Sequence, residues 1–237
     1  MSSTPLVLAG AGGFARETVG LVEAINEREP TWDLLGFVDD NPALHGGSVD
    51  GTPVLGPMEW VRGRDVRVAV CTGSPANYTS RARIVQRLGL PREHYATLIH
   101  PAAVIARSVS IGPGSVIHAL TVATGHSTIG AHVAVMPSAV VTHDDVIVDF
   151  ATIAAGVLLA GNVHVGTGAY LGSGSRVREE RTIGAWSLIG MGSVVTRDVP
   201  PGEVWAGSPA RFLRASHQRT GDLTFTTTTT SQTGAPS

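Results

Sequence analysis

The stretch IARSVSIGPGSVIHALTVATGHSTIG (residues 105–130) opens a run in which an apolar side chain returns at every sixth position without one slip. An α-helix repeats near 3.6 residues and a flat strand near 2, so a strict period of six fits neither. The period is typical of a parallel β-helix, in which three short strands form a triangular coil and one apolar residue per strand points into the prism. The apolar positions are Ile105, Ile111, Ile117, Ala123, Ile129, Val135, Val141, Ile147, Ile153, Leu159, Val165, Leu171, Val177, Ile183, Ile189 and Val195.

The residues between these positions indicate tight corners. Glycine often follows the apolar residue, as at Gly112 and Gly130, and a small residue usually stands four positions after it. Glycine supplies the conformational freedom of a corner, and small side chains allow close packing. Because three hexads make a coil, residues 18 apart should stack, and the stretch supplies about five coils. Such a repeat is primarily a scaffold, so function must come from the side chains at its corners.

The composition excludes several function classes. The chain has 237 residues, enough for one or two domains with sizeable cores. Its formal net charge of -2 lacks the basic excess of nucleic-acid-binding or membrane-surface proteins. One cysteine, Cys71, cannot form an internal disulfide, and no signal peptide or long apolar span is evident. We therefore expect a soluble protein of the reducing cytoplasm, with no nucleic-acid or membrane partner.

The N-terminal region has the pattern of a nucleotide-binding unit. Leu6 to Ala9 is expected to form a buried strand, Gly10 to Gly13 a tight turn and Phe14 to Asn26 an amphipathic helix. Such a turn presents backbone N–H groups and a helix N-terminus to an anion. The run lacks the full dinucleotide fingerprint, so a purely structural turn stays open.

Two further strands are expected to end at the same edge of a parallel sheet. Leu34 to Val38 leads into Asp39 and Asp40, and Val66 to Thr72 leads into a Gly-Ser pair. Open parallel sheets bind ligands at the carboxyl ends of their strands. We therefore predict one substrate site, although a solvated turn is the alternative for the two aspartates; its residues are Gly10, Gly12, Gly13, Asp39, Asp40 and Thr72.

Changes of pattern divide the chain into three parts. The period breaks between Gly89 and Ala103, where two prolines indicate a linker. We place a small α/β nucleotide-binding domain at 1–98 and the β-helix domain at 99–213. The segment 214–237 is polar, Thr-rich and without periodicity, and we expect it to be disordered.

The end of the repeat resembles a known family. GMGSVVTRDVPPG (190–202) and GSPAR (207–211) resemble the ending of hexapeptide-repeat acyltransferases. With the N-terminal glycine turn, the Asp39-Asp40 pair and the LIHP segment (98–101), the chain is similar to one subfamily. That subfamily contains the nucleotide-sugar 4-amino N-acetyltransferases and the sialic acid O-acetyltransferases. The resemblance covers roughly residues 5 to 213.

The resemblance implies a fold and an activity. It implies a Rossmann-like α/β domain followed by a left-handed parallel β-helix, assembled as a homotrimer with acetyl-CoA as cosubstrate in the groove between neighbouring subunits. The implied reaction is N-acetylation of the amino group of a nucleotide-linked amino sugar of the 4-amino-4,6-dideoxy type. One alternative is an O-acetyltransferase of a sugar hydroxyl. Another is a non-catalytic trimeric scaffold or nucleotide-sensing module.

His143 is the predicted general base. Amide formation needs a neutral amine, and histidine is the usual group that removes its proton near neutral pH. The subfamily's base is the histidine of a motif present here as AVVTHDD (139–145). Gly125 and Gly161 stand 18 residues on either side, so stacking predicts open space beside His143. Asp144, the predicted orienter of the imidazole, stacks with His126 and could contact that residue instead.

The remaining expectations concern the cosubstrate and the other histidines. Gly161 matches a glycine that the family uses against acetyl-CoA. Gly190 and Gly192 would line the pantetheine groove, and Arg197 or Arg211 could meet a CoA phosphate. No serine or cysteine stands beside His143, so we expect direct transfer, and no histidine pair has a convincing metal-ligand spacing. The histidines at other corners or faces, His118, His132 and His164, are expected to be solvated.

Three positions depart from the family pattern. The family commonly has a histidine where this chain has Phe14, a second histidine where it has Thr152, and an asparagine where it has Met136. These departures predict a substrate or acyl group that differs from those of the best-known members. They leave the base and the CoA groove in place.

Overall fold

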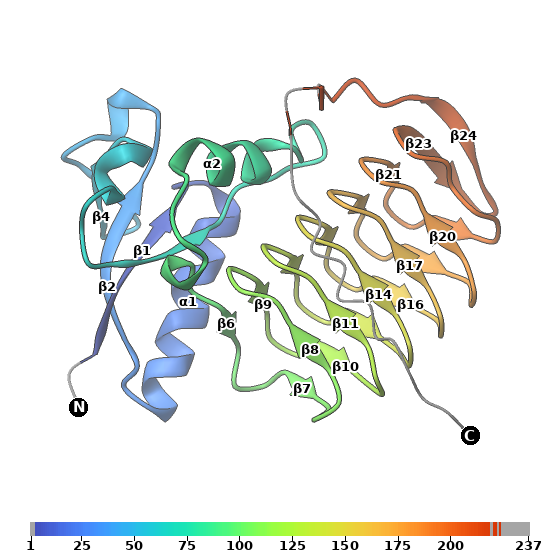
Figure 1. The fold of residues 1–237 in the computed structure, drawn as a ribbon, viewed down its shortest axis with the longest axis horizontal. Coiled ribbons are helices and arrows are strands. Elements are labelled where there is room, and N and C mark those ends of the chain that lie inside the picture. The colour runs from blue at the N-terminus through green and yellow to red at the C-terminus, as the bar shows by residue number, and fades with distance from the viewer. Residues whose placement is uncertain (1–2, 219, 222, 224–237) are drawn as a thin grey trace.

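The N-terminal unit is a parallel sheet flanked by helices. The computed structural model describes residues 3–218, 220–221 and 223. Four parallel strands lie in the order β4-β2-β1-β5, and β3 pairs antiparallel with β4 at the edge (Figure 1). The strands are β1 Thr4–Ala9, β2 Trp32–Val38, β3 Ser48–Val49, β4 Thr52–Gly56 and β5 Arg67–Val70, and the helices are α1 Gly13–Arg28 and α2 Ser80–Leu88, with short 3-10 turns at Pro42–Leu44, Met58–Val61 and Arg92–His94.

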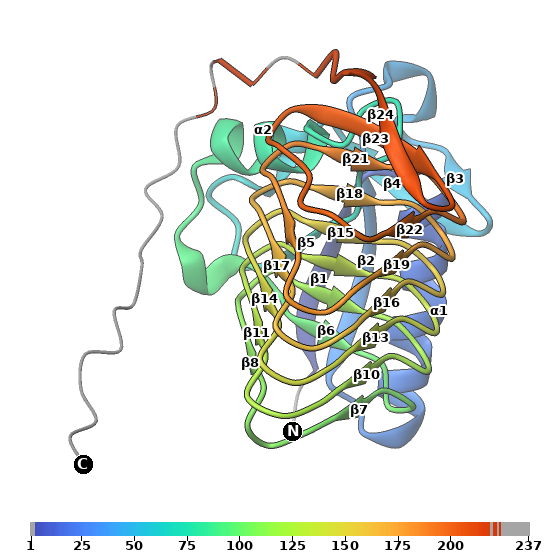
Figure 2. The ribbon, with the colours of Figure 1, turned by 90° about the vertical axis from the view of Figure 1, so that its right-hand side faces the viewer.

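The second unit is a parallel β-helix with three sheets. From Leu98 to Val177, each strand of the coils pairs with the strand 18 residues further on, as predicted, and successive coils stack evenly along the axis (Figures 1 and 2). The six-stranded sheet holds β7 Val104–Ile105, β10 Val122–Ala123, β13 Val140–Val141, β16 Leu158–Leu159, β19 Arg176–Val177 and β22 Val194–Val195. The five-stranded sheet holds β8 Ser110–Ile111, β11 Thr128–Ile129, β14 Val146–Ile147, β17 His164–Val165 and β20 Thr182–Ile183. The eight-stranded sheet holds β6 Leu98–Ile99, β9 Val116–Ile117, β12 Ala134–Val135, β15 Thr152–Ile153, β18 Tyr170–Leu171, β21 Leu188–Ile189, β23 Glu203–Gly207 and β24 Ala210–Ala215.

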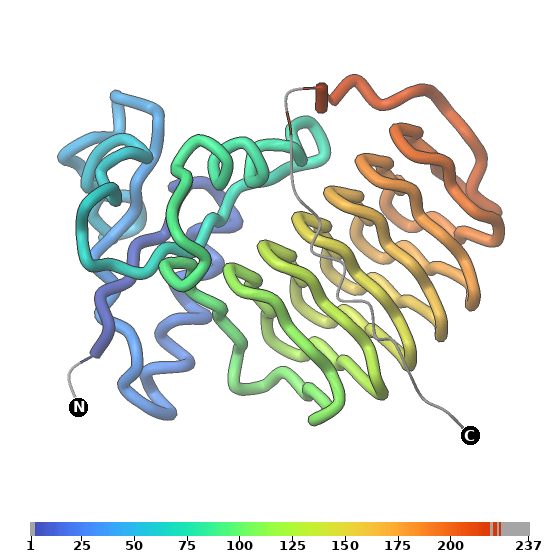
Figure 3. Tube along the Cα trace, viewed as in Figure 1, coloured from blue at the N-terminus to red at the C-terminus, as the bar shows by residue number. Residues whose placement is uncertain are grey.

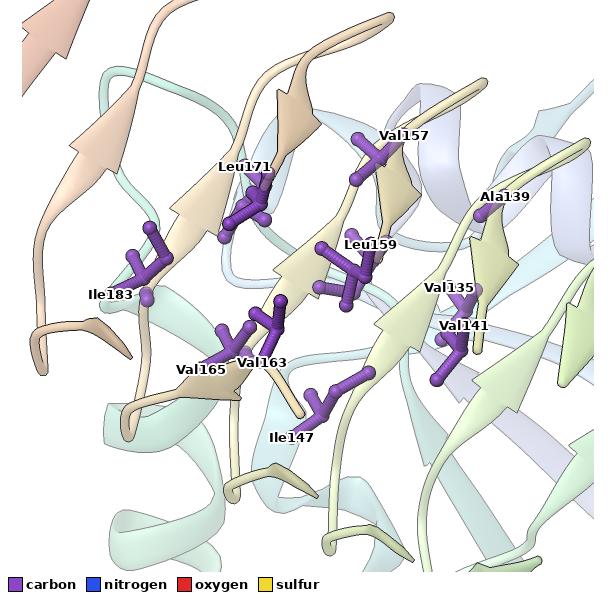
Figure 4. Packing of buried hydrophobic residues seen from close by; sticks show 14 of the residues in the cluster. Val135, Ala139, Val141, Ile147, Val157, Leu159, Val163, Val165, Leu171 and Ile183 are labelled. Atoms are coloured by element: carbon purple, nitrogen blue, oxygen red, sulfur yellow. The ribbon is translucent and has the colours of Figure 1, made fainter. Parts of the chain in front are cut away.

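The predicted apolar positions form the core of the prism. All sixteen belong to one cluster, in which only Ile105 and Ile111, at the open first coil, are partly exposed. Figure 4 shows Val141, Leu159 and Val165 pointing into the interior from their strands. Each side chain stacks on the side chain one coil away, which keeps water out along the whole axis.

The glycines after the apolar positions have a different role from the one predicted. A Cβ at Gly112 would lie 2.5 Å from the carbonyl carbon of Gly130 on the next coil, so glycine is needed there for close approach of two backbones. The left-handed conformation occurs two residues further along, at most corners. Non-glycine residues often hold it, including His126, Asp144 and Asn162.

The N-terminal unit packs on the eight-stranded sheet. Leu98 and Val116 of that sheet share one buried cluster with Leu6 and Leu21 of the N-terminal unit. The predicted linker, Gly89 to Ala103, is therefore only partly a linker, because it contains β6, the first strand of this sheet. Ile99 stands six residues before Ile105 and pairs with Ile117, so the hexad series extends one step further back than the predicted stretch.

The end of the chain is more ordered than predicted. The segment predicted to be disordered begins at 214, but β24 continues to Ala215 and pairs with β23. Figure 3 shows the chain leaving β24 and returning along the β-helix toward α2. There Gln218 donates from its amide nitrogen to the carbonyl oxygen of Ala76, 2.9 Å away. The rest of the predicted tail, at 219, 222 and 224–237, lies outside the described residues.

The three faces of the β-helix differ in polarity. The outward residue of each strand in the six-stranded sheet is mostly aliphatic: Val104, Val122, Val140, Leu158, Arg176 and Val194. The five-stranded sheet presents mostly polar residues: Ser110, Thr128, Val146, His164 and Thr182. Neither described helix is long and apolar enough to cross a membrane.

Candidate functional site

The predicted strand ends meet in one pocket of about 430 Å³. Its wall is formed by the glycine turn after β1, the aspartates after β2, the end of β5 and the start of α2. The six predicted residues Gly10, Gly12, Gly13, Asp39, Asp40 and Thr72 all line it, together with Phe14, Met58, Cys71, Gly73, Ser74, Asn77, Ser80 and Ile84. Burial raises the pKa of the Cys71 thiol to about 12, which makes it a poor nucleophile.

Both aspartates of the pocket already have partners. The Asp39 carboxylate accepts from the N–H groups of Ala11 and Asn41, each at 2.9 Å, and so holds the glycine turn against the end of β2. Asp40 accepts from Arg87 at 2.7 Å, on the rim of the pocket. The alternative of a merely solvated turn is thus wrong for Asp39, because its carboxylate organises the turn.

His143 lies at the corner between the six-stranded and five-stranded sheets. Its Nδ1 is 2.9 Å from Oδ2 of Asp144, so the predicted pair forms and the contact of Asp144 with His126 does not. Both side chains are more than half exposed. Because Nδ1 is held by the carboxylate, Nε2 is left to take a proton from a substrate.

The two glycines on the coils next to His143 differ in how close they lie to its imidazole. A Cβ at Gly161 would lie 2.3 Å from Nε2 of His143, whereas one at Gly125 would lie 3.5 Å from its Cβ. The imidazole therefore leans over Gly161 and fills the space predicted to be open on that side. Within the described part of the chain, no protein hydrogen bond uses the Gly161 N–H.

Asp145 supports the site and was missed by the sequence reasoning. Its carboxylate is fully buried and accepts from the N–H groups of Thr142 and Val163, each at 2.8 Å. The bond to Val163 attaches the corner on which His143 stands to the next coil, and the bond to Thr142 fixes the shape of that corner. Burial raises the pKa of Asp145 to about 6 in spite of both bonds. The sequence could have indicated this role, because the motif HDD (143–145) contains a second carboxylate after Asp144.

The residues predicted to contact CoA do not all lie on the corner of the β-helix that holds His143. Arg197 stands on the same corner as His143, three coils further along the axis, which corresponds to about 14 Å. Gly190 and Gly192 lie at the corner between the eight-stranded and six-stranded sheets instead. Arg211 is an exposed residue of β24. One chain thus brings only Gly161 and Arg197 onto the corner of His143.

Two histidines are buried, which corrects the prediction that they are solvated. His132 lies between the rings of Tyr95 and Phe150, and His118 packs beside Phe14. Burial lowers the pKa of His132 to about 3 and that of His118 to about 4, so both stay neutral. These two corners adjoin the sheet that the N-terminal unit covers, which the sequence alone could not reveal. His164 is exposed, as expected.

The three departures from the family pattern have identifiable surroundings. Phe14 lines the pocket and packs on His118, and Met136 stands one coil beyond His118 at the same corner. Thr152 is buried, and its hydroxyl accepts from Arg81 of α2 at 2.7 Å. Position 152 therefore serves the contact between the two units.

The pocket and His143 are on opposite sides of one chain. The pocket belongs to the unit that packs on the eight-stranded sheet, whereas His143 lies at the one corner of the prism that this sheet does not reach. Figure 2, which looks toward the end of the prism, shows this arrangement of the sheets. The pocket and the base of one chain therefore face different sides of its β-helix.

Comparison with known proteins places the chain among acetyltransferases. Residues 5–88 match the PglD N-terminal domain family. The chain is 32% identical over 217 residues to GDP-perosamine N-acetyltransferase of Escherichia coli, which covers 87% of this chain and 95% of that protein.

Solved structures agree with this match. The acetyltransferase domain of PglB from Neisseria gonorrhoeae, in complex with acetyl coenzyme A, has a TM-score of 0.79 at 30% identity and covers 90% of this chain and 100% of its own. PerB from Caulobacter crescentus, in complex with CoA and GDP-perosamine, has a TM-score of 0.77 at 30% identity. The match covers 90% of this chain and 99% of PerB. The predicted fold, a Rossmann-like unit followed by a left-handed parallel β-helix, is confirmed.

Proposed function

This chain belongs to the family of hexapeptide-repeat acetyltransferases that includes GDP-perosamine N-acetyltransferase, and we propose that it acetylates the amino group of a nucleotide-linked amino sugar with acetyl-CoA. The observation that carries the proposal is the arrangement of His143 between Asp144 and Gly161. It supplies a base with one free ring nitrogen beside an unused backbone N–H. The pocket of the N-terminal unit would hold the nucleotide.

His143 acts as the general base of the transfer. Nε2 accepts a proton from the amine as the nitrogen lone pair attacks the thioester carbonyl. The new C–N bond forms, the C–S bond breaks, and the proton passes to the leaving thiolate of CoA. The Asp144 carboxylate holds Nδ1–H and stabilises the imidazolium that forms. The Gly161 N–H is available to stabilise the negative charge on the carbonyl oxygen.

The active protein is a homotrimer with each site shared between chains. The placement of the pocket and His143 on different sides of one chain supports this, because a second chain can bring its own base to the pocket. The aliphatic face of the six-stranded sheet supports it as well. Val104 is 63% exposed and Leu158 40% exposed on that face, and burial against another copy would remove this apolar surface from water.

Acetyl-CoA lies along the corner that runs from His143 to Arg197. Gly161 presents its unused backbone N–H to the thioester, and an extended pantetheine arm can span the interval of about 14 Å between coils three apart. Arg197 is then placed to meet a phosphate group. Arg211, Gly190 and Gly192 would belong to the groove through a neighbouring chain. The site operates in the reducing cytoplasm, consistent with the single buried thiol.

Thiol release from acetyl-CoA tests the proposal. Wild type and His143→Ala are compared with GDP-, UDP- and dTDP-linked 4-amino sugars as acceptors. We expect release with one of these sugars and a loss of about a hundredfold or more in the variant. Release that survives in His143→Ala would contradict the mechanism. Release only with hydroxyl acceptors would replace N-acetylation by O-acetylation, and nucleotide binding without CoA binding would favour a non-catalytic scaffold.

A further inference from the structure

Arg81 is a buried cation at the contact between the two units. Its side chain is fully enclosed, at 2% exposure, and it takes part in no ion pair within the described residues. Burial lowers the pKa of its guanidinium to about 10, which leaves it charged at neutral pH. A buried charge without an anion is costly unless fixed oxygen atoms surround it.

The β-helix provides most of those oxygen atoms. Arg81 donates from Nε to the carbonyl oxygen of His132 at 2.7 Å. Its Nη2 donates to the carbonyl oxygens of Phe150 and Ala151 at 3.0 and 3.1 Å and to the hydroxyl of Thr152 at 2.7 Å. Because His132 and Phe150 occupy the same corner on successive coils, these groups form a rigid socket that an arginine's planar donors can fill.

The remaining nitrogen holds the wall of the pocket. Nη1 donates to the carbonyl oxygen of Thr72, the pocket residue two positions after the end of β5, at 2.8 Å. Thr72 in turn lies against the glycine turn, because a Cβ at Gly10 would be 2.8 Å from its Cγ2. A shift of Thr72 therefore changes the width of the pocket. Ser80, the residue before Arg81, also lines it.

We propose that Arg81 is a positioning residue for the acceptor pocket: by joining Thr72 to the socket of the β-helix, it sets the pocket shape on which binding of the nucleotide sugar depends. Acetyl-CoA binding should not depend on it, because the corner of His143 lies on the far side of the prism. The kinetic part of this inference rests on the proposed function. The binding part does not, since it concerns the nucleotide alone.

The test compares variants at both ends of the contact. Arg81→Met removes the charge and all donors, and Thr152→Val removes one of the three acceptors of Nη2. Thr152→Ser, which restores the hydroxyl, is the matched rescue. Leu88→Ala is the control for stability, because Leu88 is a buried residue of the same helix that does not line the pocket and does not bond to the β-helix socket. Each variant is measured for thermal stability, for KM of both substrates, and for calorimetric binding of GDP, UDP and dTDP.

We expect Arg81→Met to raise the KM for the nucleotide sugar, and the Kd of the bound nucleotide, by about tenfold or more, with the KM for acetyl-CoA within about twofold. Thr152→Val should show the same selective change on a smaller scale, and Thr152→Ser should reverse it. If Arg81→Met does not fold, the comparison of Thr152→Val with Thr152→Ser tests the inference instead. The inference would be overturned if Leu88→Ala raised the nucleotide Kd as much as Arg81→Met does. Equal changes in the KM for the nucleotide sugar and the KM for acetyl-CoA would overturn it as well. If no acceptor is turned over, the nucleotide Kd still tests it.

Discussion

The reactive histidine depends on the absence of a side chain one coil away. The imidazole of His143 occupies the volume in which a Cβ at Gly161 would lie, with 2.2 Å to Cε1 as the closest approach. Real Cβ atoms do not come so close, so any side chain at 161 must displace the ring. The backbone of Gly161 is not in the left-handed region, and an alanine there would not be strained by its φ angle.

Gly161→Ala should therefore lower kcat by about a hundredfold, because the base loses its position while the fold is kept. Steady-state kinetics together with the melting temperature measure both effects. Gly125→Ala is the matched control, since its Cβ would lie 3.5 Å from Cβ of His143, an ordinary contact. Equal activity of the two variants would show that the imidazole does not need to lean over Gly161 in order to react.

The buried carboxylate beside the motif offers a second test at this scale. Asp145→Asn keeps the size of the side chain but exchanges one accepting oxygen for a donor that faces an N–H group of Thr142 or Val163. We expect a loss of about 1–3 kcal/mol in the free energy of unfolding. Urea denaturation measures it, and Asp144→Asn, at the exposed neighbour, should cost far less stability. A smaller loss for Asp145→Asn than for Asp144→Asn would contradict the assigned roles.

Sequence reasoning at the residue scale succeeded where neighbours are 18 positions apart. Stacking arithmetic placed Gly125 and Gly161 beside His143 because the coil length fixes those contacts. It could not find Arg81, whose partners are carbonyl oxygens about 50 to 70 residues away, at His132, Phe150 and Ala151. Contacts of that kind depend on how two units pack, which no local pattern encodes.

At the scale of elements, the three faces of the β-helix were predicted only in part. The inward positions follow from the period alone, but which face is covered depends on the N-terminal unit. Burial of His118 and His132 therefore had no sequence signal. Two short segments were also misjudged. β6 continues the hexad series through Ile99 but lies beside prolines that indicated a linker, whereas β24 pairs with β23 without carrying the hexad pattern.

Leu158→Arg tests the aliphatic face of the six-stranded sheet. The outward side chain of β16 would place a second charge beside Arg176, its partner on the next strand, and like charges there oppose association. We expect the trimer to dissociate to a monomer in light scattering, with activity falling by about tenfold or more. Thr128→Arg, on the polar five-stranded face, is the control and should keep wild-type mass. A trimeric Leu158→Arg protein would exclude this face from the interface.

At the scale of the whole molecule, the buried titratable groups predict how stability changes with pH. His118 and His132 have folded pKa values of about 4 and about 3, below the ordinary 6.5, so the unfolded chain binds more protons as the pH falls below 6.5. Stability from this pair is thus present above pH 6.5 and is lost toward pH 4. Asp145 acts in the opposite direction, because its folded pKa of about 6 exceeds 3.8 and favours the folded state at low pH.

Two histidines against one carboxyl leave a net uptake of one proton on unfolding, so stability should fall by about 1.4 kcal/mol per pH unit in this window. His132→Phe removes one of the two histidines and fits between Tyr95 and Phe150, whose rings already enclose the imidazole at 4.5 and 5.1 Å between centroids. The slope of stability against pH should then approach zero, because the proton that His118 takes up on unfolding is balanced by the proton that Asp145 releases. Urea denaturation between about pH 4.5 and 7.5 measures it, with the exposed His164→Phe as the control. If His132→Phe keeps the wild-type slope, the acid sensitivity originates in groups other than His132, and that ring is not the neutral, buried group that the packing indicates.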